Sequence, residues 1–295
     1  MVSDNHPPTR DARIGDRAQL ILIAAIALAF IILGIVVVFN SVLYTQTMSS
    51  SSSIETTSDA QLAELEMARG VRGVAQEVNL DSSPDLDGVN STLETNSEAF
   101  VRQYGNATAE RRPAVVNLSA IGANESARAI NSNTIDDNIL GSGPREIGHF
   151  SLELESGSVD EVEITATDSS GSDTISVRRE NDELVITPDG SSDCRFEHNG
   201  DPIVFDFTDD TIIGATIPDC SIKLIEPTNN YTDISINDHG DADGGYELVA
   251  RGNTNIGGDR SGHPAAWTVD LEYTYDTSEL SVEREFEVDV YGDRR

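Results

Sequence analysis

Apolar residues follow three different spacings along the chain, and each spacing predicts a different kind of element. Between Leu20 and Phe39 nearly every residue is Ile, Leu, Ala, Val or Phe, and residues 18–54 carry no charged side chain. A helix of this length spans about 30 Å, which is the thickness of the hydrocarbon core of a bilayer. The continuous apolar run therefore predicts one transmembrane helix over residues 18–45.

Basic residues lie on one side of this apolar run. Arg10, Arg13 and Arg17 precede it, and the next Arg or Lys along the chain is Arg69. Because basic residues beside a span stay in the cytoplasm, residues 1–17 are predicted to be cytoplasmic and the C-terminal part extracellular. A secretory signal peptide is the alternative, but its apolar region is shorter and ends at a small-residue cleavage site. We therefore expect a single-pass protein of the cell membrane.

The second spacing, of three and four residues, is typical of helices and follows a Ser/Thr-rich linker at 46–57. It predicts helices over residues 58–79 and 91–104. A third helix is predicted over 113–129, because proline suits a first helical turn. Together these elements predict a helical stalk over residues 58–130.

The third spacing is strict alternation, which predicts β-strands after a polar linker at 131–146. The last two runs form a long antiparallel hairpin over 267–290, in which Arg284 interrupts the apolar face. That charge either discourages edge-to-edge pairing or marks a bulge. We expect an α+β fold with an N-terminal transmembrane helix, a short helical stalk and a C-terminal antiparallel β-sandwich or open barrel over 147–293.

Acidic residues dominate the part of the chain after the apolar run. The formal net charge is −33, and residues 1–17 contribute nothing to it because they hold three Arg and three Asp. Lys223 is the single lysine in the sequence. An ordinary acidic secreted protein is one interpretation, but this composition resembles proteins of extremely halophilic archaea, in which salt screens the repulsion. A surface of this charge excludes nucleic acid as a partner.

Motifs of catalysis are absent from the sequence. It contains no HExxH, Walker phosphate loop or GxSxG, and its five histidines are scattered one to a segment. Residues 238–244 resemble part of a calcium loop, but His239 and Ala250 stand where that loop needs its first and last ligands. The sequence therefore predicts a protein that is not an enzyme and has no metal site or cofactor.

Two kinds of covalent modification are consistent with an extracellular location. Cys194 and Cys220 either form a disulfide, which persists outside the cell, or remain two separate buried thiols. Asn-x-Ser/Thr sequons provide acceptor sites for N-glycosylation at Asn90, Asn106, Asn117, Asn124 and Asn230.

The residues just before the apolar run point to a family. Arg17, Ala18 and Gln19 lead directly into the uninterrupted hydrophobic helix. This arrangement resembles the prepilin-type cleavage signal of archaeal type IV pilins. The resemblance implies that prepilin peptidase cuts after Ala18 and leaves Gln19 as the new N-terminus. It also implies a helix followed by a β-rich head, and a role as a pilin-like subunit of a type IV pilus-type surface assembly.

An unprocessed single-span surface protein, with a β domain for adhesion or partner binding, is the alternative function. In both cases membrane lipid is a predicted partner. In a filament, other pilin-like subunits would pack against the apolar helix, where Ala25 and Ala29 form a small-xxx-small pair.

Overall fold

The computed structural model describes most of the chain between residues 57 and 292. The described ranges are 57–81, 85–108, 114–123, 127–140, 143–155, 157–181, 183–188, 192–197, 200–214, 220–227, 229–240, 242–252 and 262–292. Residues Ala60–Arg295 form one compact unit. The transmembrane helix predicted over residues 18–45 lies outside the described residues.

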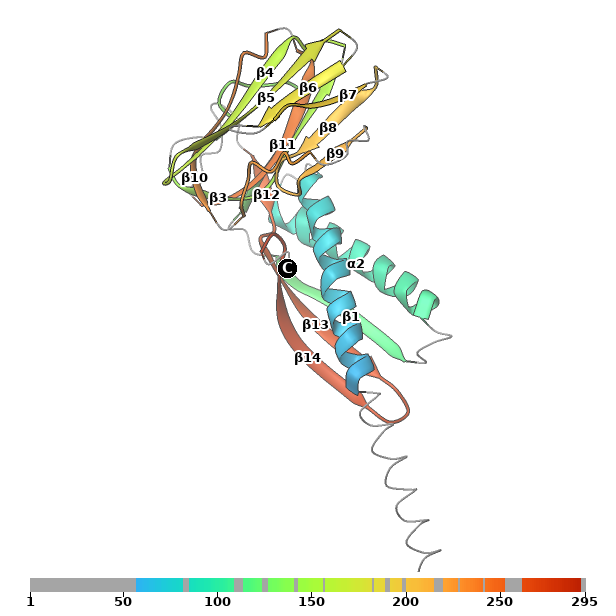
Figure 1. The fold of residues 1–295 in the computed structure, drawn as a ribbon. Coiled ribbons are helices and arrows are strands. Elements are labelled where there is room, and N and C mark those ends of the chain that lie inside the picture. Colours follow the sequence, from blue (N-terminus) through green and yellow to red (C-terminus); the bar gives the residue numbers. More distant parts are fainter. Residues whose placement is uncertain are drawn as a thin grey trace, which may run out of the picture. The chain divides into compact units, whose positions relative to one another are not determined.

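Two helices precede the strands in the described part of the chain, at residues 57–80 and at α2, Leu86–Thr108 (Figure 1). Asp85 caps α2, because its Oδ1 accepts a hydrogen bond of 2.9 Å from the Gly88 N–H. This cap explains why α2 begins five residues before the predicted start at residue 91. The helix over 57–80 buries one apolar stripe, formed by Ala60, Ala63, Met67, Val71, Ala75 and Val78.

The remaining described elements are fourteen strands, and every pair of them is antiparallel. Their bounds are β1 Val115–Ala123, β2 Ala127–Ser132, β3 Arg145–Glu155, β4 Glu161–Asp168, β5 Ser172–Glu180, β6 Glu183–Pro188, β7 Cys194–Glu197, β8 Pro202–Asp206, β9 Thr211–Ile213, β10 Asn230–Asn237, β11 Gly244–Gly252, β12 His263–Ala265, β13 Thr268–Asp276 and β14 Ser281–Asp289.

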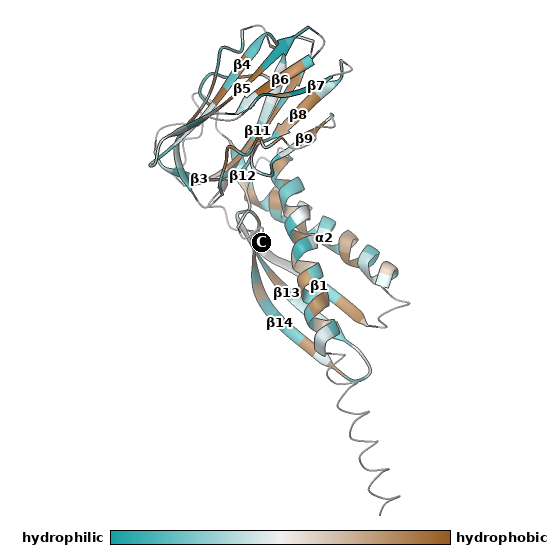
Figure 2. Cartoon of the chain, in the orientation of Figure 1, coloured by the Kyte–Doolittle hydropathy of each residue, from teal (hydrophilic) through white to brown (hydrophobic). Residues whose placement is uncertain are grey.

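A three-stranded sheet in the order β1-β13-β14 packs one face against the helices (Figure 1). Apolar and polar residues alternate along β13 and β14 (Figure 2), so that one face of each strand is apolar. The helix–sheet core is the buried cluster between this sheet, the helices and neighbouring strands. It includes Met67, Val71, Ala75, Leu93, Leu118, Val249, Trp267, Val269, Leu271, Tyr273, Val288, Val290 and Tyr291.

The larger sheet has eleven strands and folds over a second core. Its order is β12-β2-β11-β3-β10-β4-β5-β6-β7, and β8 joins it by pairing with β3 and β9. Besides β11, β3 has two further partners. Its residues Ser151–Glu155 pair with β8, and Arg145 and Glu146 pair with β10, so the sheet divides at β3. The sandwich core lies between the resulting layers. It includes Phe150, Leu152, Leu154, Val162, Ile164, Ile175, Val177, Leu184, Ile186, Phe205, Ile234, Ile236, Leu248 and Ala250.

Two strands contribute side chains to both cores, because alternate residues point to opposite faces of a sheet. In β11, Leu248 and Ala250 belong to the sandwich core, whereas Val249 belongs to the helix–sheet core. In β2 the same alternation separates Ile130 from Ala129. The two cores are therefore built on opposite faces of the same strands.

A buried asparagine fastens the end of the first helix to the last strands. Asn79 Nδ2 donates to the Ala266 carbonyl at 2.7 Å and to the Tyr291 hydroxyl at 2.9 Å. Asn79 Oδ1 accepts a hydrogen bond of 2.7 Å from the Ala266 N–H. Burial raises the pKa of Tyr291 well above its usual range. The amide thus satisfies three polar groups inside the helix–sheet core.

The fold class predicted from the sequence is wrong for the described residues, which form mostly strands with two helices. The helix predicted over 113–129 is instead β1 and the start of β2. The final hairpin, predicted to belong to a C-terminal sandwich, forms the three-stranded sheet with β1. The reason is long-range pairing, since β1 takes its partner β13 from the far end of the chain. Within the predicted helical stalk over residues 58–130, the described residues after 114 are therefore strand instead of helix.

The terms transmembrane helix, membrane and pilin-like, which the sequence suggested, receive no support from the described elements. None of the helices between residues 57 and 292 that the structure describes is both long enough and apolar enough to cross a bilayer. What the described fold retains of the sequence prediction is the β-rich, sandwich-like character of the C-terminal part and the two helices predicted over 58–79 and 91–104, which are present over 57–80 and 86–108.

The structure excludes a bulge as the reason for Arg284 and gives this residue a partner on the first helix. The β13–β14 register runs without a shift from Thr268 opposite Asp289 to Asp276 opposite Ser281, so no bulge occurs there. Arg284 Nη1 instead lies 2.9 Å and 3.2 Å from the two carboxylate oxygens of Glu64. The charge that interrupts the apolar face therefore bonds β14 to the helix over 57–80.

Candidate functional site

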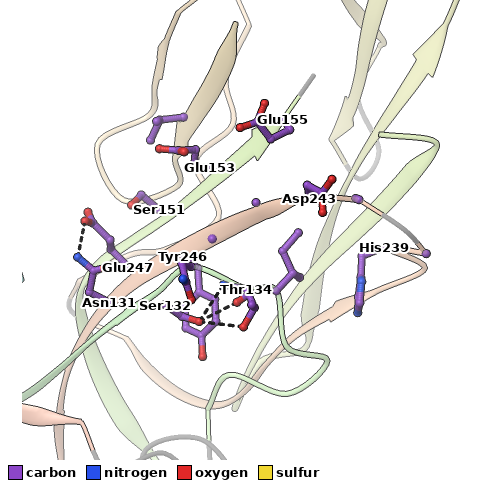
Figure 3. Close-up of a pocket in the computed structure, with 17 residues that line it drawn as sticks. Asn131, Ser132, Thr134, Ser151, Glu153, Glu155, His239, Asp243, Tyr246 and Glu247 are labelled. Atoms are coloured by element: carbon purple, nitrogen blue, oxygen red, sulfur yellow. Dashed lines mark hydrogen bonds between the residues drawn. The ribbon is translucent and has the colours of Figure 1, made fainter. Parts of the chain in front are cut away.

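An acidic hollow of about 940 Å³ lies on the outer face of β2, β3 and β11 (Figure 3). It forms there because alternate residues of β3 point away from the sandwich core. Phe150, Leu152 and Leu154 face that core, so Ser151, Glu153 and Glu155 face the hollow. The name acidic hollow is used below for the cavity lined by these three residues together with Asn131, Asp243, Glu247 and their neighbours.

Two glycines leave room for the hollow and hold its strands close together. A Cβ atom on Gly244 would collide with the Glu153 carbonyl, and one on Gly245 would collide with the Ser132 carbonyl. Glycine inside a strand is typical of such close backbone approach. The glycines therefore allow β11 to lie tightly against β2 and β3.

The hollow is acidic on two sides. Glu153 and Glu155 line it from β3, and Asp243 and Glu247 line it from the β11 side. No Arg or Lys is among the described residues that line it. Glu247 Oε1 accepts a hydrogen bond of 3.3 Å from Asn131 Nδ2. The carboxylates of Glu153, Glu155 and Asp243 have no hydrogen-bond or ion-pair partner among the described residues.

Ser151 lies at the base of the acidic hollow, between Glu153 and Glu247 in the close-up (Figure 3). The residue is only 4% exposed. Its hydroxyl group forms no hydrogen bond to any residue that the structure describes. Because Ser151 lines the hollow, its hydroxyl group reaches that open space and is not enclosed by protein.

A histidine borders the acidic hollow where the helix over 57–80 ends. His149 Nδ1 lies 3.7 Å from Asp206 Oδ2, and His149 Nε2 lies 3.7 Å from Glu247 Oε2. A smaller cavity of about 220 Å³ beside it is lined by Gln76, Glu77, Leu80, Asp206, Asp209 and Tyr291. His239 also lines the acidic hollow, and its Nε2 lies 2.8 Å from Asp137 Oδ1. His263 lies elsewhere, with its Nε2 2.9 Å from the Asn79 carbonyl oxygen.

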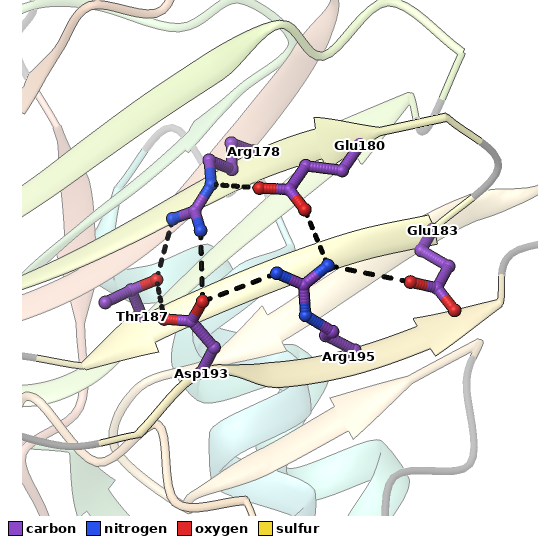
Figure 4. Close-up of polar contacts among 6 residues, drawn as sticks. All are labelled: Arg178, Glu180, Glu183, Thr187, Asp193 and Arg195. Atoms are coloured by element: carbon purple, nitrogen blue, oxygen red, sulfur yellow. Dashed lines mark hydrogen bonds and ion pairs between the residues drawn. The ribbon is translucent and has the colours of Figure 1, made fainter.

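The opposite layer of the sandwich carries a network of ion pairs on β5, β6 and β7 (Figure 4). Arg195 and Arg178 both bond Glu180, and these contacts hold the pKa of the Glu180 carboxyl below its usual range. A hydrogen bond from Thr187 and the charge of Arg178 likewise lower the pKa of Asp193. Because these partly exposed side chains are paired with one another, we interpret the network as structural.

Residues 14–138 match a family of unknown function, DUF7261. The matched range ends before β3 begins, so it includes the two described helices, β1 and β2. It therefore excludes most of the sandwich and all of β13 and β14. No curated protein matches the chain.

The structure places Cys194 and Cys220 in a disulfide, with their Cα atoms 5.9 Å apart. Cys194 begins β7, and both cysteines pack against the sandwich core. The bond therefore ties the edge strand β7 to the segment that leads toward β10.

The predicted sequons lie in different environments. Asn106, Asn117 and Asn230 are exposed. Asn90 is partly buried, and its Oδ1 accepts a hydrogen bond of 2.9 Å from the Ala123 N–H. Asn124 lies outside the described residues, as do Arg17, Ala18 and Gln19 of the predicted cleavage signal. The amide group of Asn90 is thus already engaged in holding β1 to α2.

The structure also shows the surroundings of the final hairpin's aromatic residues and of the segment that resembles a calcium loop. The aromatic stripe of the final hairpin is buried, since Trp267, Tyr273 and Tyr275 are at most 3% exposed. The stripe therefore forms core and presents no aromatic surface to a ligand. Near residues 238–244, the described His, Cys, Asp and Glu residues form no group of three or more that could hold a metal ion.

The acidic hollow was not found from the sequence. Glu153 and Glu155 have the pattern of an ordinary solvated strand face, and nothing local indicates that Asp243 and Glu247 lie beside them. The available signal is Gly244-Gly245, because paired glycines at the start of a strand indicate close backbone approach.

Proposed function

We propose that the protein is a structural subunit of a surface assembly, similar to type IV pilins, and not an enzyme. The observation that carries this proposal is the attachment of the helix over 57–80 to the three-stranded sheet. A subunit of this kind needs a β-rich head held firmly by the helix that precedes it, and the described arrangement supports that requirement.

Polar contacts join this helix to the final strands from its first turn to its last. They are Ala60 C=O to the Tyr273 hydroxyl at 3.1 Å, Glu64 to Arg284 at 2.9 Å, Arg72 Nε to Asp289 C=O at 3.0 Å, Gln76 Nε2 to Val290 C=O at 3.0 Å, and Asn79 to Ala266 at 2.7 Å. The buried apolar stripe runs along the same side. A load applied through this helix would reach the head through many contacts acting together.

Processing at the predicted signal tests the proposal. The full-length protein should be isolated from its native cells and its N-terminal peptide identified by mass spectrometry. We expect Gln19 as the first residue. A mature protein that begins at Met1 or Val2 would contradict a pilin-like subunit and leave the unprocessed surface protein.

Assembly can be tested separately by shearing filaments from the cell surface. The processed chain is expected in the sheared fraction, and a variant with a charged residue in place of Ala18 is expected to stay with the cells, unprocessed. If both forms appear equally in the sheared fraction, processing does not control assembly.

A partner-binding module is the second candidate function, and the acidic hollow favours it. The cavity is polar, open to solvent and lined by residues of β2, β3, β8 and β11. Such a site is compatible with either a filament subunit or an isolated surface protein.

A further inference from the structure

We propose that the acidic hollow binds an organic cation that presents a primary ammonium or guanidinium group. The site is the juxtaposition of Ser151, Glu153 and Glu155 on β3 with Asp243 and Glu247 on the β11 side. This binding goes beyond the structural role proposed above and does not depend on it.

Charge is the first argument. Three carboxylates in the hollow, those of Glu153, Glu155 and Asp243, have no partner among the described residues. A concave surface lined by one sign of charge focuses its field and concentrates ligands of the opposite sign. The ion-paired face of β5, β6 and β7 lacks this property, because Arg178 and Arg195 neutralise the acids there.

The Ser151 hydroxyl is the second and independent argument. Ser151 is only 4% exposed and lines the hollow, and no described residue bonds its hydroxyl group. A hydroxyl oxygen can accept a hydrogen bond from an N–H group. A cation that enters the hollow and donates to Ser151 would satisfy a group that the protein itself leaves without a partner.

The arrangement of the acids selects the class of cation. The described acids do not gather into a group that could hold a metal ion; they are spread over two strands. The volume of about 940 Å³ lies in the range of sites for small organic molecules. Ammonium and guanidinium groups donate several N–H bonds in different directions, so one ligand can bridge β3 and β11.

Binding measured at high salt distinguishes a specific site from non-specific electrostatic attraction. At about 1 M ionic strength the screening length falls to about 3 Å, so only groups in direct contact still attract each other. Agmatine is a suitable probe, because it carries a guanidinium at one end and an ammonium at the other. We expect saturable binding of agmatine to the full-length protein in about 1 M KCl, measured by isothermal titration calorimetry.

Matched variants locate the binding. The double variant Glu153→Gln, Glu155→Gln should weaken agmatine binding by about tenfold or more, because two charge-assisted contacts are lost. Glu285→Gln, Glu287→Gln makes the same change on an exposed strand face away from the hollow, and should change the affinity by less than about twofold. Ser151→Ala keeps every charge and should weaken binding several-fold.

Three results would overturn the proposal. The first is a lack of saturable binding by the wild-type protein in the salt-containing buffer. The second is an equal loss of affinity in the β14 control. The third is saturable binding of calcium that displaces agmatine, which would replace the organic cation by a metal ion. None of these results bears on cleavage after Ala18, so this proposal and the pilin-like role can fail independently.

Discussion

The sandwich and the helix–sheet region differ in how far apart along the chain their partners lie. In the sandwich, β4, β5, β6 and β7 pair with their immediate neighbours through short connections. In the helix–sheet region, β1 pairs with β13, and Asn79 bonds Ala266, 187 residues away. The layer formed by β4–β7 is held by local hairpins and one disulfide, whereas the helix–sheet region closes only when both ends of the described chain meet.

The exposed faces of the two regions differ as well. On β5, β6 and β7, Arg178 and Arg195 bridge the acidic residues around them. On the outer face of the three-stranded sheet, Asp270 lies directly opposite Glu287, and Glu272 lies opposite Glu285. Like charges at directly opposed positions are destabilising. The β5–β7 face of the sandwich is therefore compensated by its own arginines, whereas the opposed acids of the three-stranded sheet have no ion pair among the described residues.

The largest expected effect comes from the disulfide of the sandwich. Cys194→Ser with Cys220→Ser should lower the free energy of unfolding by about 3.5 kcal/mol, because a loop of 26 residues is no longer closed in the unfolded chain. Denaturant unfolding at constant high salt measures the loss, and reduced wild-type protein is the control. Hydrogen exchange should rise most in β6 and β7. An equal rise in the helix over 57–80 would show that the two regions open together.

Asn79→Ala tests the helix–sheet region in the same way. It leaves the Ala266 N–H and C=O buried without their partner, and should cost about 3 kcal/mol. Asn131→Ala is the control, since Asn131 is exposed and should change stability by less than about 0.5 kcal/mol. Hydrogen exchange should rise first in the helix over 57–80. If the increase is confined to β4–β7, the assignment of Asn79 to this region is contradicted.

Two glycines on the helix over 57–80 provide a test with a smaller effect, in which the two substitutions should change stability in opposite directions. A methyl group on Gly70 would collide with the ring of Phe100, so Gly70→Ala should destabilise the protein by about 2 kcal/mol. Gly73 has open space around its Cβ position, so Gly73→Ala should stabilise it by up to about 1 kcal/mol. Thermal unfolding of both variants at one salt concentration suffices. Shifts of the same sign would mean that α2 does not pack closely on this helix.

The smallest effect concerns the uncompensated sheet face. Glu287→Arg places opposite charges across from each other at Asp270 and should add about 0.5 to 1 kcal/mol in dilute buffer. The gain should fade near 1 M KCl, where screening extends over only about 3 Å. Glu180→Arg, made in the paired network, should instead reduce stability because it removes the acid that Arg178 and Arg195 share. If the stability gained by Glu287→Arg does not change with salt concentration, an electrostatic cause is contradicted.

The elements that could be predicted from the sequence are those whose apolar residues follow a regular local spacing. Alternation at Phe150, Leu152 and Leu154 indicates β3, and the spacing of Met67, Val71 and Ala75 indicates a helix. The strand β1 was missed although Val116 and Leu118 alternate with polar residues, because Pro113 suggested a helix start. Its partner β13 begins more than 140 residues later, which no local pattern reveals.

The acidic hollow escaped prediction for the same physical reason. Each of its acids is ordinary in its own strand, and only the register of β11 against β3 brings Glu247 opposite Ser151. Gly70 shows the same limit of sequence-based prediction. From the sequence, a glycine at this position predicts only a less stable helix. The ring of Phe100 explains the glycine, and that contact depends on how two helices pack.

Because alternate residues of β11 belong to two different cores, both cores fix the register of this strand. A slip of one residue would exchange the two faces of the strand, moving Leu248 beneath the helices and Val249 into the sandwich. Both cores would be disrupted by a single displacement, so an insertion or deletion inside this strand cannot be absorbed by either side. Sequence drift in this protein should therefore change the side chains of β11 while its length stays fixed.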